Sequence, residues 1–223
     1  MGRMHFRSSL AFTALTMSVT IVLCAQQEPS GSSSSRNTKP EQHVKRDSSS
    51  DLAAKVYRNP TYSFSYKVPY GWVERTREME ADASGAANSD PAGAKVLLAI
   101  FERPPEAVGD TVNSAVVIAE EPASSYPGLK SAADYLGPVT ELATSKGFRS
   151  AGDPSEVTIS GRTFVRADFT RDLGILTMRQ ATLILLQKPS IVSFTFIGGS
   201  EDEIEQLIEN LSVETRRSSP PKK

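Results

Sequence analysis

The chain has 223 residues, with 25 lysines and arginines against 26 aspartates and glutamates, one cysteine and two histidines. A single cysteine excludes an intramolecular disulfide. The scattered charge does not favour nucleic acid as a partner, because binding to phosphate backbones requires clustered Lys and Arg. The region from 51 to 215, which we predict to fold, is net acidic, with 15 basic against 23 acidic residues.

The N-terminal 24 residues have the layout of a secretory signal. Arg3 and Arg7 precede an uncharged run from Leu10 to Leu23, after which the sequence turns polar. The run has fourteen residues, fewer than the roughly twenty of a membrane-spanning helix. We therefore expect an exported protein that is periplasmic, membrane-tethered or extracellular.

Cys24 closes this run, as the lipid-attachment cysteine does in bacterial lipoproteins. Ile21 and Val22 match such a signal, whereas Leu23 stands where a small residue is expected. Two interpretations stay open: lipid attachment at Cys24, or cleavage near Cys24-Ala25 by the general signal peptidase. If Cys24 is lipidated, we expect the N-terminus to be the only contact with the membrane.

Polar segments frame the predicted domain. Residues 25–50 are rich in Ser and nearly free of apolar side chains, and the basic tail at 216–223 is similar. Such segments cannot bury enough apolar surface to offset their conformational entropy. We predict a disordered linker at 25–50, one domain at 51–215 and a disordered tail.

The domain opens with a hairpin. A period-two pattern predicts a strand with one buried face, and its apolar members are Tyr62, Phe64, Tyr66 and Val68. Residues 55–58 pair with it as the preceding strand. Pro69-Tyr70-Gly71 ends it and places Trp72 at the start of the next strand.

Short apolar runs bounded by turn residues predict the later strands. These are 94–102, 114–119, 156–160, 163–169, 176–187 and 191–197. Gly161-Arg162 and Lys188-Pro189-Ser190 form the turns of two hairpins.

Two segments carry helical spacing. Residues 131–146 have one apolar face, with Pro138 expected to kink or split the helix and Gly147 to end it. The second helix begins at Ser200, with Glu203 completing a capping box, and its apolar stripe is Ile204, Leu207, Ile208 and Leu211. The class is α+β, with a mainly antiparallel sheet flanked by helices.

Three stretches give the chain a family resemblance. They are residues 59–64 leading into Pro69-Tyr70-Gly71-Trp72, the hairpin at 159–164, and the 194–196 strand running into the Ser200 helix. In these the chain resembles the PsbP-like superfamily, which includes a Ran-binding import factor and small bacterial envelope proteins. The resemblance implies an α/β/α sandwich and a binding or assembly role, with Ser63 standing where a glycine is expected.

The predicted domain lacks the commonest catalytic side chains. His5, His43 and Cys24 all lie outside it. A Ser-His-Asp or Cys-His site, a zinc site built from His and Cys, and iron–sulfur or haem ligation by His or Cys are therefore excluded within it. We predict no catalytic residue, no cofactor and no metal.

Carboxylate chemistry is compatible with this composition. Glu78, Glu80 and Asp82 recur at every second position and would project together from an extended loop, with Asp90 further on. A mobile acidic insertion is the preferred interpretation over a cation site, because the loop lacks the features of an EF-hand. A pair of acids acting on glycans is the alternative function.

Other residues have a structural and a functional interpretation. Gly198-Gly199-Ser200 resembles an anion-binding helix start, but the acids that follow favour capping. Arg166 and Asp168 are expected to pair on the wetter face of their strand. Tyr70 and Trp72 are the candidate contacts for a partner, with burial of Trp72 the preferred alternative.

The first functional hypothesis is therefore an exported, lipid-anchored or secreted envelope protein with a non-catalytic binding or assembly domain. Its partners would be other envelope proteins, which the sequence does not identify. A structural accessory subunit of an envelope complex is a further alternative.

Overall fold

The computed structural model describes residues 55–85 and 93–214. The predicted signal at 1–24, the linker at 25–50, the tail at 216–223 and both Cys24 and Asp90 lie outside the described residues. These assignments stay predictions.

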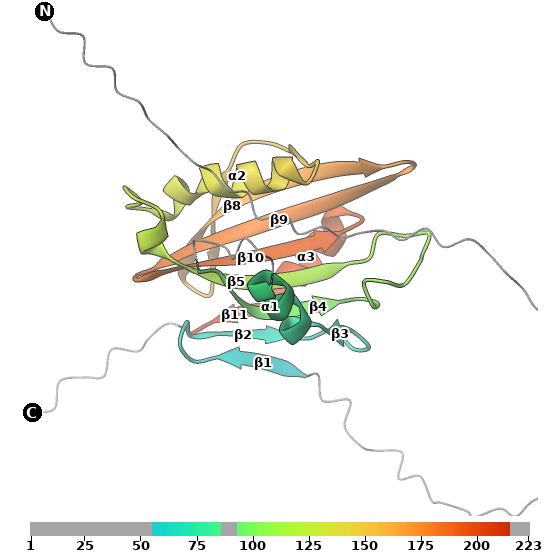
Figure 1. Cartoon of the computed structure of the whole chain (residues 1–223), viewed down its shortest axis with the longest axis horizontal. Coiled ribbons are helices and arrows are strands. Elements are labelled where there is room, and N and C mark those ends of the chain that lie inside the picture. The colour runs from blue at the N-terminus through green and yellow to red at the C-terminus, as the bar shows by residue number, and fades with distance from the viewer. Residues whose placement is uncertain (1–54, 86–92, 215–223) are drawn as a thin grey trace, which may run out of the picture.

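An eight-stranded antiparallel sheet forms the centre of the molecule (Figure 1). Its strands pair in the order β3-β4-β5-β10-β9-β8-β6, and β7 also pairs with β8. Their bounds are β3 Val73–Glu74, β4 Lys95–Phe101, β5 Ala115–Pro122, β6 Arg149–Ser150, β7 Ser155–Ile159, β8 Arg162–Leu173, β9 Leu176–Gln187 and β10 Ser190–Gly198. The predicted α+β class with a mainly antiparallel sheet is confirmed.

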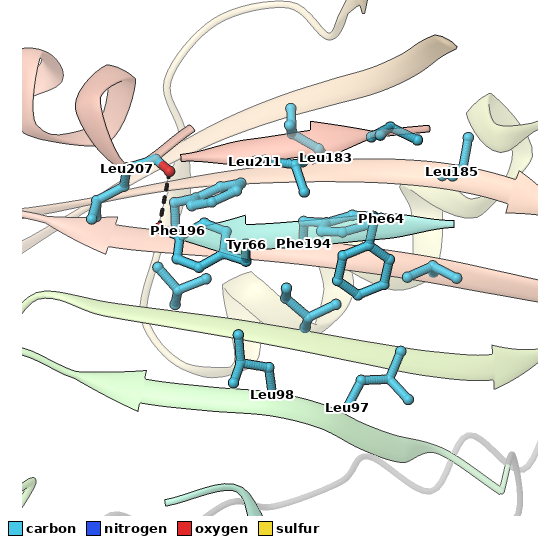
Figure 2. Packing of buried hydrophobic residues seen from close by; sticks show 14 of the residues in the cluster. Phe64, Tyr66, Leu97, Leu98, Leu183, Leu185, Phe194, Phe196, Leu207 and Leu211 are labelled. Carbon is cyan, nitrogen blue, oxygen red and sulfur yellow. Dashed lines mark hydrogen bonds between the residues drawn. The ribbon is translucent and has the colours of Figure 1, made fainter. Parts of the chain in front are cut away.

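A small sheet and a helix cover one face of the large sheet. The small sheet has the order β1-β2-β11, with bounds β1 Val56–Asn59, β2 Phe64–Lys67 and β11 Leu211–Val213. Phe64 packs edge-on against Phe194 with ring centroids 5.1 Å apart. The hydroxyl of Tyr66 donates to the carbonyl of Leu207 in α3 (Glu201–Glu209) at 3.0 Å (Figure 2).

Helices cover the other face. α1 (Thr76–Gly85) packs against β4, whereas the 3-10 segment η2 (Ala132–Tyr135) and α2 (Leu136–Ser145) lie over β8 and β9 (Figure 1). A short 3-10 turn, η1 (Ala123–Ser125), follows β5. Val139, Phe169 and Ile184 belong to the apolar cluster between α2 and the sheet. The layers are those of an α/β/α sandwich in which the small sheet shares one outer layer with α3.

The predicted features of both helices are confirmed with two exceptions, both in the second helix: the position of Leu211 and the partner of the Glu203 carboxylate, which is the N–H of Gly199 rather than that of Ser200. The first segment splits at Leu136, and Pro138 lies in the first turn of α2, where a missing N–H costs little. Gly147 follows the helix with φ 81°, as a C-terminal stop does. Leu211 was wrongly assigned to the second helix, because α3 ends at Glu209 and Leu211 is buried as the first residue of β11.

Two hairpin turns lie one residue from their predicted positions. Ile159 pairs with Arg162, so Ser160-Gly161 forms the first turn, and both residues have positive φ. Ser190 pairs with Gln187 and belongs to β10. Ser160 and Ser190 are small polar residues, which occur both in turns and at strand ends, so the sequence pattern does not assign them to one or the other.

The backbone conformation of Ser63 explains why a glycine is expected at position 63. Its φ is 53°, a left-handed conformation that costs a non-glycine residue roughly 1–2 kcal/mol. Its carbonyl accepts a hydrogen bond of 2.7 Å from the N–H of Glu214, which holds the turn before β2.

We predict that Ser63→Gly raises the free energy of unfolding by about 1 kcal/mol, because glycine adopts this φ without strain. The measurement is urea unfolding followed by fluorescence. Ser65→Gly in β2 is the matched control and should lower stability by roughly 0.5–1 kcal/mol. Equal destabilisation by both substitutions would contradict strain at Ser63.

Candidate functional site

Tyr70 stands at the apex of a β-turn that leaves the small sheet. The N–H of Trp72 approaches the carbonyl of Pro69 at 3.4 Å, and Gly71 between them has φ 83°. The side chain of Tyr70 is 90% exposed. Trp72 is half-buried and packs against the main core. The turn therefore presents Tyr70 to solvent on a base fixed by Trp72.

Pairing registers place this turn beside two other loops. Val73 pairs with Phe101, and Phe101 pairs with Ala115, so residues 68–72 and the loop 102–114 lie at the same end of the sheet. Ile197 pairs with both Ala115 and Gln180, which brings the β8–β9 turn at 174–175 to that end as well. We call these three segments the loop end (Figure 1).

The predicted extended acidic loop is wrong. Glu78, Glu80 and Asp82 lie in α1, where residues two apart point about 200° away from each other. Glu78 contacts Arg75 at 3.4 Å. These three acids therefore do not converge on a cation.

The start of α3 is occupied by its own acid. Ser200 Oγ accepts from the N–H of Glu203 at 3.2 Å, and Glu203 Oε2 accepts from the N–H of Gly199 at 2.7 Å. The hydroxyl of Ser114 donates to Glu203 Oε1. The predicted preference for capping over anion binding is confirmed, although the reciprocal bond goes to Gly199 rather than to Ser200.

A shallow pocket of about 320 Å³ opens beside this helix start. It is lined by Arg179, Gly199, Ser200, Glu201 and Asp202. Arg179 contacts Glu201 at 3.0 Å. The two acids are consecutive residues of one helix turn, so the pocket does not present carboxylates on opposite walls, as glycoside hydrolysis requires.

Arg166 and Asp168 pair as predicted. Arg166 Nε lies 2.9 Å from an Asp168 oxygen, and Arg166 also contacts Glu205 of α3 at 2.7 Å. The Arg166 side chain is only 19% exposed because α3 shelters it. These hydrogen bonds raise the pKa of the guanidinium despite its partial burial. The group fastens α3 to β8.

A carboxylate with two tyrosines was not predicted. The hydroxyls of Tyr126 and Tyr135 both donate to Glu121, at the end of β5, and the two rings meet edge-on with centroids 4.9 Å apart. Burial, followed by the negative charge of Glu121, raises the pKa of Tyr135. Positions 121, 126 and 135 do not follow the repeat of one helix or one strand. The sequence pattern therefore does not predict this cluster. It links the η1 region and η2 to the sheet.

Neither a metal site nor a membrane helix is found in the described part of the chain. Within 55–85 and 93–214, no three His, Cys, Asp or Glu side chains gather as ligands. No helix in these ranges is long and apolar enough to cross a bilayer.

No family model and no curated protein matches the chain. Several solved structures are similar in fold, and three of them follow. The cyanobacterial PsbP of Synechocystis sp. PCC 6803 has 12% identity and a TM-score of 0.48, over 74% of this chain and 96% of that one. The Ran-binding protein Mog1p of Saccharomyces cerevisiae has 12% identity and a TM-score of 0.41, over 73% and 96%. LpqN, involved in cell envelope biogenesis of Mycobacterium tuberculosis, has 13% identity and a TM-score of 0.36, over 75% and 88%.

The superfamily that the sequence resembles includes PsbP proteins and a Ran-binding import factor, and these similar structures include a PsbP and a Ran-binding protein. Identities and TM-scores this low carry no statement about activity or partner.

We predict that Tyr135→Phe flattens the alkaline loss of stability. A raised pKa in the folded state means that stability is fully present below the ordinary value of 10.0 and falls as the pH rises above it. Removing one such tyrosine should reduce that slope by about 1.4 kcal/mol per pH unit.

The measurement is urea unfolding at several pH values between about 9 and 11.5. Tyr70→Phe is the control for removal of a phenol hydroxyl outside the buried cluster, because the side chain of Tyr70 is 90% exposed. If Tyr135→Phe keeps the full slope, Tyr135 does not contribute to the alkaline transition.

Proposed function

We propose that this chain is an exported envelope protein whose domain is a non-catalytic binding or assembly module. The observation that carries the proposal is the distribution of reactive residues. Both histidines and the cysteine lie before residue 55, so residues 55–214 contain neither type. The predicted signal at 1–24 supports export.

Three carboxylates are held in hydrogen bonds or ion pairs within the fold, which supports a binding role over an enzymatic one. Glu121 accepts from two tyrosines, Asp168 holds Arg166, and Glu203 caps α3. A general acid or base needs a group free to exchange a proton with a substrate. These three acids are instead fixed by contacts that hold elements of the fold together.

The binding surface in this proposal is the loop end, through Tyr70. Its side chain projects from a turn whose base is held by the packing of Trp72. An exposed aromatic ring on a fixed support contributes contact area at low conformational cost. Trp72 acts as the support rather than as a direct contact.

We predict that residues 1–24 direct export. A fusion of residues 1–60 to alkaline phosphatase, which is active only outside the cytoplasm, should give phosphatase activity in cells. A fusion lacking residues 1–24 should give none. Equal activity of the two fusions would remove the export half of the proposal.

We also predict that lysine-directed crosslinking in intact cells joins the exported chain to envelope components, identified by mass spectrometry. The chain lacking residues 1–24 is the control and should lose these products. Purified chain incubated with glycans should release no reducing sugar. Glycan cleavage that disappears in Glu201→Gln but persists in Glu209→Gln would instead establish the enzymatic alternative.

A further inference from the structure

Exposed large hydrophobic residues gather at one end of the molecule. Five occur among the described residues, at exposures of 42% for Val56, 90% for Tyr70, 100% for Val108, 102% for Ile175 and 40% for Leu142. Tyr70, Val108 and Ile175 belong to the three segments of the loop end. Val56 pairs with Lys67, immediately before the Tyr70 turn, and so lies there too. Only Leu142, on α2, lies elsewhere.

The three most exposed of these residues stand at the apices of separate loops. Ile175 occupies a two-residue turn after Gly174, where Leu173 pairs with Leu176. Val108 precedes Gly109, which packs so closely on the guanidinium of Arg103 that an added Cβ would lie 2.8 Å from it. Turn apices ordinarily hold polar residues and glycine, so apolar side chains at three apices on one end of the sheet set that end apart.

Their spacing fits a fluid surface better than a folded protein. From β3 to β9 the sheet spans four strand intervals, roughly 20 Å. A specific protein interface is a contiguous, closely packed patch of about 800 Å² on each side. Separate apolar apices are instead surrounded individually by lipid, and tyrosine is favoured at the membrane interface.

The charges at this end do not form a cationic patch. Arg103 contacts Glu102, Arg149 contacts Asp172, and Arg179 contacts Glu201. The predicted domain as a whole is net acidic. Attraction to anionic lipid headgroups therefore cannot supply the binding, which has to come from insertion of apolar side chains.

The position of the chain termini agrees with this orientation. The 54 residues that precede the described domain join it at Lys55, whose carbonyl accepts from the N–H of Val68 at 2.7 Å, at the loop end. The other terminus leaves after β11, where Val213 pairs with Phe64 at the opposite end (Figure 1). A tether attached to a membrane would bring the loop end toward it.

We propose that the loop end lies against a lipid bilayer, with Tyr70, Val108 and Ile175 inserted at the interface. The inference rests on the export half of the proposed function.

Trp72, the only tryptophan, is a native reporter at the loop end. The experiment mixes the full chain with zwitterionic phosphatidylcholine vesicles whose acyl chains carry bromine, a short-range quencher. We expect quenching of Trp72 in the bound protein, and equal binding when anionic phosphatidylglycerol is added.

Val108→Ser and Ile175→Ser should each weaken vesicle binding about tenfold and reduce quenching, because each removes one inserted aliphatic group. Leu142→Ser, on α2, is the matched control and should behave as the unaltered chain. Circular dichroism of each variant checks that the fold is retained.

Bound protein with unquenched Trp72 would mean that the N-terminal segment alone holds the chain, and would overturn the proposal. The proposal is also overturned if Val108→Ser and Ile175→Ser bind vesicles as well as Leu142→Ser does. If Val108→Ser and Ile175→Ser keep their vesicle binding but lose a defined crosslink to a protein, the loop end contacts a protein partner instead. The vesicles contain no other protein. A negative vesicle result therefore does not bear on export or on partner binding, which the fusion and crosslinking experiments test.

Discussion

The docking of β2 onto the large sheet is the constraint on which the rest of the structure depends. Phe64 fits edge-on against Phe194, and the buried hydroxyl of Tyr66 reaches the last turn of α3. One short strand thereby joins the small sheet, the large sheet and the C-terminal helix. Because its side chains alternate strictly, a shift of one residue would turn every ring toward solvent. Its register is therefore strongly fixed.

The same docking determines which segments meet at the loop end. β2 runs toward that end and delivers the Tyr70 turn there, while its antiparallel partner β1 begins there. Both the entry of the N-terminal segment and the exposed aromatic ring follow from a single strand direction. The opposite end receives the turn at Ser63 and the exit of β11. The N-terminal entry and the C-terminal exit of the domain thus lie at opposite ends of the small sheet.

The sequence predicted the parts of this fold that depend on local periodicity. The β2 pattern, the split at Pro138 and the Ser200 cap all come from interactions within a few residues, which spacing reveals. The sequence pattern did not predict that Glu78, Glu80 and Asp82 lie on a helix. The reason is that α1 packs on β4 with little apolar periodicity of its own. The hydrogen bonds of Glu121 depend on how the chain folds back after β5 through η1 and η2. The gathering of Tyr70, Val108 and Ile175 depends on pairing between distant strands. A linear pattern contains neither.

Contacts to neighbouring segments support each apex of the loop end. Trp72 packs against the core beneath Tyr70, Arg103 donates to the backbone and side chain of Thr111 across the loop that carries Val108, and Ile175 sits on paired strands. Ordering a flexible loop on contact would cost free energy for each immobilised side chain. Apices already held in place avoid most of that cost, so a few apolar side chains suffice for a weak, reversible contact. The N-terminal segment enters the domain at this same end, through Lys55, so any attachment of that segment would keep these apices close to whatever it is attached to.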